Sequence, residues 1–453
     1  MRRFAFPLAL ALSLHLALPT LAVEKPLTLE AAIARALETH PDARIARSQI
    51  EQADLGVADV SSQRLQVSAD ASVLGRHAQT GLMADNVPAT TTDQTGINGT
   101  IGLTIPIFTG GKLMQGLRAA ERNRDAASYQ GAMTRADLTF EVTRAFWSLA
   151  RQEALVQVQE ETQVQAQRAL SLTKASYGLG RLTSNDVDRA EVDALNTQDS
   201  LMRVKAQAEE ARVRLAVLLG MPAADVAIAP TPNLPLTKAS TTPATRQAAA
   251  PVLASEAEAW PEPEQALARH PRVLAAQARV EAAEAGVAAA HGDRWPQLAL
   301  ITTYQHGNNP FDPLSGARGL GSFSGTWDAR VSANLNVFDN GRIGREIAKA
   351  EAELAIARAT LSKTRREVRS SIEVALIKAR SAQQRAALAG RSSGVAEKTL
   401  SWVEARYQQG YSLLVEVHDS RRSLLTARTQ RIEAEIDYQI ARAELALALG
   451  RSE

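Results

Sequence analysis

Apolar residues recur along this chain with two different periods, and the switch between them marks out its elements. Where apolar and polar residues alternate one by one, successive side chains would lie on opposite faces of a strand. The last such segment is the clearest, with Trp327, Val331 and Val337 on its apolar side. Residues 75–96 and 307–321 are rich in Gly, Asn and Pro and are expected to be loops. The pattern predicts four strands, at residues 66–73, 97–107, 298–304 and 327–337.

The remaining segments have a helical period. Residues 112–177 and 342–407 contain no proline, so each predicts one continuous helix of about 66 residues and about 100 Å. In residues 184–219 the apolar positions alternate steps of three and four, which is the seam of a left-handed coiled coil. Ser184 is the predicted N-cap of that helix.

The chain also repeats itself, since His270-Pro271 follows His40-Pro41 by 230 positions. Each His-Pro step is expected to end one short helix and begin another, because proline suits the first turn and restricts the residue before it. Biased composition does not hold one spacing over roughly 180 residues, so the chain is interpreted as two copies of one unit. Further pairs with the same spacing are Phe108 and Phe338, Tyr177 and Tyr407, Gly180 and Gly410, and Leu219-Gly220 and Leu449-Gly450.

The duplication divides the chain into a first repeat at residues 23–221, a second repeat at residues 264–450 and a tail at residues 451–453. Between the repeats, residues 222–263 carry eight prolines. Prolines at that density prevent a long helix. This segment is therefore predicted to be an irregular linker at the middle of the molecule.

Residues 1–22 are predicted to be a secretory signal peptide. Arg2 and Arg3 precede an apolar stretch at residues 4–18, and Thr20-Leu21-Ala22 suits cleavage. The alternative is a membrane anchor, but the stretch is short for a span. The formal charge of +2 gives no reason to expect a nucleic acid partner, and the lack of cysteine excludes disulfides and lipid attachment at a cysteine.

The predicted strands pose a physical problem, because their apolar face needs a core or lipid. The helices on either side are too long to fold back over two strand pairs, so the apolar face is expected to meet lipid and the polar face a water-filled lumen. A barrel in a membrane must close, and four strands are too few to close alone. Several copies are therefore expected to share one barrel. The alternative is a periplasmic coiled-coil adaptor or scaffold whose strands form a small soluble sandwich and which conducts nothing.

The order of these units resembles the TolC-like outer-membrane efflux protein family, also called outer membrane factors. The motifs that carry the resemblance are His40-Pro41, Pro106-Ile-Phe-Thr-Gly-Gly-Lys112, Ala175-Ser-Tyr-Gly-Leu-Gly180, Ala405-Arg-Tyr-Gln-Gln-Gly410 and Val415-Glu-Val-His-Asp-Ser-Arg-Arg-Ser-Leu424. The resemblance implies an α+β, mostly helical fold. It further implies a homotrimer whose twelve-stranded transmembrane β-barrel continues into a coiled-coil barrel of helices in the periplasm.

The same resemblance implies an outer-membrane channel, extending into the periplasm, for tripartite efflux or type I secretion. Its implied partners are outer-membrane lipid, a periplasmic adaptor and an inner-membrane pump. It also places the adaptor contact and the closed end of the tunnel at the turns between the long helices. The residues implied at these turns are Tyr177, Gly180, Arg181, Asp186, Tyr407, Gly410, Tyr411 and Ser412.

Glu416 and Asp419 match the family's acidic constriction, where a trimer would present rings of three carboxylates that favour cations. The alternative is that they only compensate a helix dipole. The adaptor turns depart from the usual Val-Gly-Leu, and Ser412 replaces a basic residue, so different charge pairs are expected here. Asp186 is the candidate acceptor, with Arg181 or Arg406 as donor.

No enzyme activity or cofactor is expected. The stretch from Thr109 to Lys112 lacks the spacing of a phosphate-binding loop and is interpreted as a strand-to-helix turn. His40 and His270 stand directly before a helix start, so they are interpreted as helix caps and not as metal ligands. The sequence does not distinguish drugs, metal ions and proteins as substrates.

Overall fold

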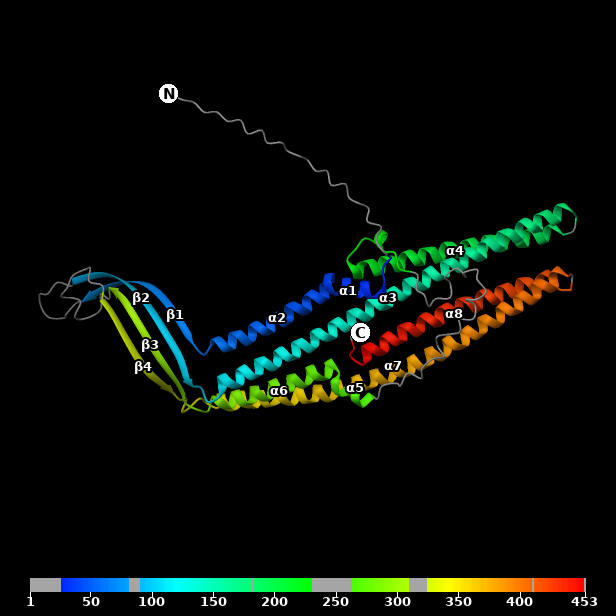
Figure 1. Ribbon diagram of the computed structural model, residues 1–453. Helices are drawn as coiled ribbons and strands as arrows, with labels where there is room; N and C mark the ends of the chain where they lie inside the picture. The colour runs from blue at the N-terminus through cyan, green and yellow to red at the C-terminus, as the bar shows by residue number, and fades with distance from the viewer. Residues whose placement is uncertain are drawn as a thin grey trace, which may run out of the picture.

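The computed structural model describes residues 26–80, 90–180, 182–229, 263–308, 324–409 and 411–451. The predicted signal peptide and most of the predicted linker, from residue 230 onwards, lie outside the described residues. The described part is an elongated molecule with a small sheet at one end and long helices along the rest (Figure 1). The mostly helical α+β class is confirmed.

Both halves of the chain show the same order of two short helices, two strands and two long helices. The first half contains α1 (Leu29–Thr39), α2 (Pro41–Ser62), β1 (Gln66–Thr80), β2 (Thr90–Phe108), α3 (Lys112–Gly178) and α4 (Ser184–Leu219). The second contains α5 (Pro263–Arg269), α6 (Pro271–Gly292), β3 (Gln297–Asn308), β4 (Ser324–Asn334), α7 (Arg342–Gln408) and α8 (Leu414–Ala448). A single 3-10 turn, η1 (Ala223–Asp225), follows α4.

Several strand boundaries differ from the prediction. β1 and β2 continue as a paired ribbon as far as Thr80 and Thr90, so much of the predicted loop at residues 75–96 is strand. The polar composition of that stretch concealed it, because the two strands are held together by backbone pairing, which does not require apolar side chains. β4, in contrast, ends at Asn334 and not at residue 337.

The four strands form one antiparallel sheet in the order β1-β2-β3-β4. Its register puts the apolar positions of every strand on one face. One row across the sheet runs from Ala69 to Ile101, Tyr304 and Trp327, each paired with the next. Figure 1 shows no helix lying across the sheet, and Trp327 is 74% exposed. The sheet therefore has a continuous apolar face that nothing in the described chain covers.

The helices form a layer in which α3 is the central member. Beside the sheet α3 packs between α2 and α6, and α6 packs on α7. In the other half α3 packs between α4 and α8, and α8 packs on α7 (Figure 1). Several of the largest buried side chains, among them Phe146, Leu149 and Leu215, lie where the short helix α1 joins this layer. Many of the other buried positions are alanines, which let the long helices approach closely.

The His-Pro steps are built as predicted. The Nδ1 of His40 accepts a hydrogen bond from the N–H of Asp42 at 3.2 Å, and the Nδ1 of His270 accepts one from Arg272 at 3.1 Å. The capping interpretation of both histidines is confirmed. Within the described residues, no group of three or more His, Asp or Glu side chains is arranged to hold a metal ion.

The turn from β2 to α3 fits tightly against the end of α6. Gly110 has a φ of +61°, and a Cβ built there would lie 2.3 Å from the carbonyl oxygen of Gly292. Lys112 Nζ lies 2.8 Å from an Asp293 carboxylate oxygen beside this contact. Two glycines thus let the backbones of the two repeats touch at the base of the sheet. Among the described helices, none is long and apolar enough to cross a membrane.

Candidate functional site at the hairpin tips

The end of the α3–α4 hairpin is held by a capping box. Thr183 Oγ1 accepts a hydrogen bond from the N–H of Asp186 at 3.4 Å, and Asp186 Oδ2 accepts one from the N–H of Thr183 at 2.9 Å. These bonds from Thr183 hold the pKa of the Asp186 carboxyl below its usual range. The N-cap is therefore Thr183, and the prediction of Ser184 was wrong by one residue. The Thr-x-x-Asp spacing of a capping box was the signal that could have found it.

The structure brings Tyr177, Gly180 and Asp186 together at this tip. Tyr177 is 50% exposed, and Gly180 adopts a φ of +75°, which lets the chain reverse. Arg181 lies outside the described residues. The carboxylate of Asp186 is engaged by Thr183, including its hydroxyl at 2.8 Å, so it is not a free acceptor within the hairpin.

The end of the α7–α8 hairpin is more apolar. Tyr407 is 43% exposed and Tyr411 is 74% exposed, and Gly410 between them lies outside the described residues. An Arg406 guanidinium nitrogen donates to the carbonyl oxygen of Tyr411 at 3.4 Å. Arg406 thus holds its own turn, and the predicted Arg406–Asp186 pair does not form within the chain. The hydroxyl of Ser412 hydrogen-bonds to the carboxylate of Glu416.

Glu416 and Asp419 lie in the first two turns of α8, three residues apart, and both are exposed. Three residues correspond to nearly one turn, so the two carboxylates belong to one side of the helix. Among the described residues neither of them forms an ion pair. Leu413 at the N-cap supplies no side-chain cap, so a negative charge here also compensates the start of α8.

Ion pairs behind the tips tie the helices together, and sequence patterns did not identify them. Arg421 of α8 lies 2.8 Å from Glu404 of α7. Farther from the tip, Asp437 of α8 lies 2.6 Å from Arg151 of α3 and 3.7 Å from Arg385 of α7. Asp437 therefore connects the two hairpins, next to an apolar contact between α3 and α8. That contact consists of Ala154, Val158, Ile432 and Ile436.

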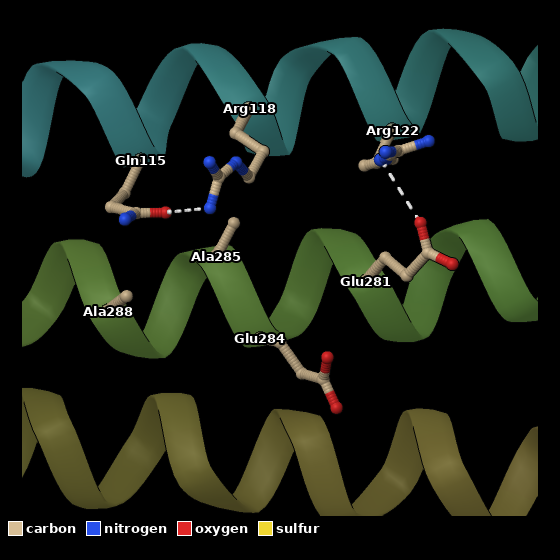
Figure 2. A pocket seen from close by; sticks show the side chains of 7 residues that line it. All are labelled: Gln115, Arg118, Arg122, Glu281, Glu284, Ala285 and Ala288. Carbon is tan, nitrogen blue, oxygen red and sulfur yellow. Dashed lines mark hydrogen bonds and ion pairs between the residues drawn. The ribbon is translucent and has the colours of Figure 1, made fainter.

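A polar groove of about 420 Å³ runs between α3 and α6 (Figure 2). Arg122 reaches across it to Glu281 at 3.1 Å, and Arg118 donates to Gln115 at 3.5 Å. Ala285 leaves the space open on the α6 side. The groove is a surface feature between neighbouring helices, crossed by charged side chains.

A sheet with one bare apolar face, continued by two long helical hairpins, is the fold of solved outer-membrane channel proteins. Solved structures with this fold include the outer membrane protein VceC of Vibrio cholerae, with a TM-score of 0.73 and 19% identity over 93% of this chain and 96% of that one. The CmeC outer membrane channel of Campylobacter jejuni gives a TM-score of 0.72 and 16% identity over 93% of this chain and 85% of that one.

The chain belongs to the outer membrane efflux protein family, whose model matches residues 32–221 and 263–451. The family and the solved structures of this fold are outer-membrane channel proteins and not enzymes. Among known proteins, the chain is 26% identical to the fusaric acid resistance protein FusA of Burkholderia cepacia over 71% of its own length. It is also 26% identical to the cobalt-zinc-cadmium resistance protein CzcC of Cupriavidus metallidurans over 43% of its length. The matched regions span 57% and 43% of those relatives.

Proposed function

We propose that three copies of this chain form an outer-membrane duct through which an inner-membrane pump expels its substrates. The observation that carries this proposal is the sheet, whose apolar face has no cover and whose two outer edges, on β1 and β4, have no pairing strand among the described residues. Lipid can cover such an apolar face, and strands of other copies can pair with the backbone groups of such edges. Three copies supply the twelve strands of one barrel.

The helical layer supports the same closure. α4 and α7 lie at its two opposite edges in the tip half, because the packing order there is α4, α3, α8, α7. Each edge helix exposes a stripe of apolar side chains in coiled-coil steps, which is the pattern of a helix that lacks its partner. The stripe on α4 consists of Val192, Leu195, Met202, Val213 and Val217, and that on α7 of Val374, Ile377, Leu388, Val395 and Trp402. Packing α4 of one copy on α7 of the next covers both stripes and closes a ring.

The hairpin tips are proposed to receive a periplasmic adaptor. Tyr177, Tyr407 and Tyr411 present large exposed rings there, beside Leu179 and Leu413, which are 71% and 70% exposed. Arg181, Gly180, Gly410, Asp186 and Ser412 complete the proposed contact. Exposed aromatic side chains are the residues that interface cores favour. Docking would separate the tips and open the tunnel.

Glu416 and Asp419 are proposed to line the closed end as two rings of three carboxylates. Their exposure, their common side of α8 and their lack of ion pairs within the described chain support this role. Such rings attract cations and repel anions. The names of the two relatives concern resistance to fusaric acid and to metal ions, which favours efflux over protein secretion for this chain. The pump would determine the substrate, because the duct conducts passively.

Electron microscopy of particles extracted from outer membranes in detergent tests the duct. Three-fold tubes with a barrel at one end and a shaft of about 100 Å are expected, since each 67-residue helix has that length. Compact particles, or rods without a barrel, would refute it.

Single-channel recording tests the rings. Replacing both Glu416 and Asp419 by alanine is expected to lower cation selectivity and block by polyvalent cations. Replacing the exposed Asp188 and Asp193 of α4 provides a control with the same loss of charge. Equal selectivity in the two double variants would remove the ring assignment.

A further inference from the structure

The polar groove between α3 and α6 lies next to the membrane, given the insertion of the sheet proposed above. We propose that this groove holds the phosphate headgroup of an anionic phospholipid from the periplasmic leaflet, with Arg118 as the principal cation. Its walls are Gln115, Arg118 and Arg122 on α3 and small or acidic side chains on α6 (Figure 2). The depth of the groove below the sheet, its apolar surroundings and its unequal charges support this assignment.

The groove lies at the depth of phospholipid headgroups. α3 begins at Lys112 directly after the sheet, so Gln115 and Arg118 lie about 5 and 9 Å along its axis. Headgroups occupy roughly 5–8 Å on each side of the hydrocarbon core. Side chains of a helix lean towards its N terminus, which for α3 is the sheet end, and a long arginine side chain extends farther in that direction. The guanidinium of Arg118 therefore reaches the headgroup layer.

Exposed apolar side chains indicate that this side of α3 borders lipid. Trp295 and Phe338, in the turns at the base of the sheet, are 60% and 88% exposed. Aromatic side chains in such a position mark the boundary between hydrocarbon and headgroups. Met114 of α3 is 64% exposed and precedes Arg118 by four residues, so both project from the same side of the helix. A bare methionine one turn from the sheet suits a lipid surface and not a water-filled lumen.

The carboxylates of the groove are already engaged by other cations. Glu281 lies 3.1 Å from Arg122, which crosses the groove. Glu284 lies 2.8 Å from Arg358 and points away from the groove towards α7 (Figure 2). Both acidic residues of α6 are thus neutralised without the help of Arg118.

Arg118 is the cation that the groove leaves open. Its guanidinium donates to the neutral amide oxygen of Gln115 at 3.5 Å and forms no ion pair among the described residues. A guanidinium has five N–H donors in a planar fork that matches the oxygens of a phosphate. Ala285 and Ala288 on the facing helix are too small to fill the space of about 420 Å³. The groove therefore offers room and charge-assisted hydrogen bonds to a phosphate.

Further cations at the base of the sheet favour an anionic lipid over a neutral one. Arg294 and Arg342 are exposed and form no ion pair within the part of the chain that the structure describes. The carboxylates nearest to them along the chain are occupied. Asp293 lies 2.8 Å from Lys112, and Asp339 accepts hydrogen bonds from two backbone N–H groups at the start of α7. The resulting excess of positive charge attracts anionic headgroups.

Native mass spectrometry of the assembled protein measures which lipid it retains. Protein released from nanodiscs with equal amounts of phosphatidylglycerol and phosphatidylcholine is expected to keep phosphatidylglycerol with several-fold preference. Arg118→Gln is expected to lower this preference several-fold, because it removes the charge and keeps a polar side chain. Arg135→Gln is the matched control, since Arg135 is exposed on the same helix and forms no ion pair among the described residues. Arg135 lies about 35 Å from the start of α3 and thus far from the headgroups.

A second variant acts in the opposite direction and separates loss of the site from loss of the fold. Glu281→Gln removes the carboxylate that holds Arg122 and frees a second cation in the groove, so the preference for phosphatidylglycerol is expected to rise. Inorganic phosphate in excess is expected not to displace the lipid, because it has no acyl chains to contact the apolar surroundings. Displacement by inorganic phosphate would identify a site for free phosphate and overturn the assignment to lipid.

The remaining outcomes separate this site from the proposed duct. Equal preference in Arg118→Gln and Arg135→Gln would overturn the lipid site. A change of ion selectivity in Arg118→Gln with unchanged lipid retention would also overturn it and would place Arg118 in the lumen. Three-fold tubes that retain both lipids equally would remove the site and leave the duct intact, whereas a wild-type protein that does not insert into nanodiscs would remove both.

Discussion

His270 is expected to make the stability of the fold depend on pH. The residue is 3% exposed, and its imidazole caps α6 by accepting a hydrogen bond from the N–H of Arg272, which requires an unprotonated Nδ1. Burial, and secondarily the positive charge of Arg272, lowers the pKa of His270 from 6.5 to about 4. The folded state therefore binds this proton less readily than the unfolded state does.

The direction and the size of this pH dependence of stability follow from the difference in proton binding between the folded and unfolded states. Between pH 6.5 and 4 the unfolded chain holds the proton and the folded chain does not, so stability is complete above pH 6.5 and falls as the pH is lowered. The pKa of His270 falls from 6.5 in the unfolded state to about 4 in the folded state, and each pKa unit is worth about 1.36 kcal/mol. The fold therefore loses about 3 kcal/mol of stability by pH 4. Below pH 4 both states hold the proton, and this contribution to the pH dependence ends.

The variant His270→Asn isolates this effect, because asparagine can still accept the capping hydrogen bond but does not titrate. Urea unfolding of detergent-solubilised protein, followed by circular dichroism at one protein concentration, gives the free energies at each pH. The difference between wild type and variant is expected to grow in favour of the wild type by about 3 kcal/mol from pH 4 to pH 7. His40→Asn at pH 7 measures what exchanging a histidine cap costs by itself. A difference that stays constant with pH would refute the reasoning.

Two further pairs of variants test local contacts. Thr183→Ala is expected to lower the local stability of the start of α4 by about 1 kcal/mol, because it removes the cap. This loss would be seen as roughly five-fold faster hydrogen exchange of the first-turn amides. Ser184→Ala should leave that exchange unchanged, and equal effects of the two variants would contradict the capping box. Gly292→Ala is expected to lower the free energy of unfolding by about 1–3 kcal/mol, because its Cβ would lie 2.9 Å from the Gly110 carbonyl. In Gly286→Ala the added Cβ would have nothing within 4 Å, so this variant should raise the free energy of unfolding by up to about 1 kcal/mol. If the urea midpoints of the two glycine variants moved in the same direction, that result would count against the tight contact at Gly292.

The sequence predicted the helices well, because proline positions and apolar periods are local signals. The predicted start of α3 at residue 112 and both bounds of α4 match the structure. The ends of the strands were less predictable, since they depend on neighbours distant in sequence. β1 and β2 extend through polar residues as long as each pairs with the other. β4 stops where its pairing stops, although its apolar alternation continues to Val337.

At the hairpin tips, too, the positions of residues were predictable from local sequence signals, whereas their contacts were not. Their places in the turns were predictable from the duplicated Tyr-x-x-Gly pattern, and the structure brings Glu416 and Asp419 onto one helix as expected. Their hydrogen-bond partners were not predictable, because side-chain partners depend on the turn conformation. Asp186 could be assigned as an acceptor from its charge, but only the turn shows that Thr183 occupies it.

The two joints of the proposed ring cannot be identical, and the reason lies at the base of the sheet. Within the chain, Gly110 and Gly292 allow backbone contact that any Cβ would block. The equivalent positions at the joint between copies are Asn340, which has the same left-handed backbone with a φ of 54°, and Ser62. Both carry side chains, so the turns there must stand farther apart. A ring of six similar repeats is therefore expected to alternate tight joints within each chain with wider joints between chains, and to assemble and dissociate at the three wider joints.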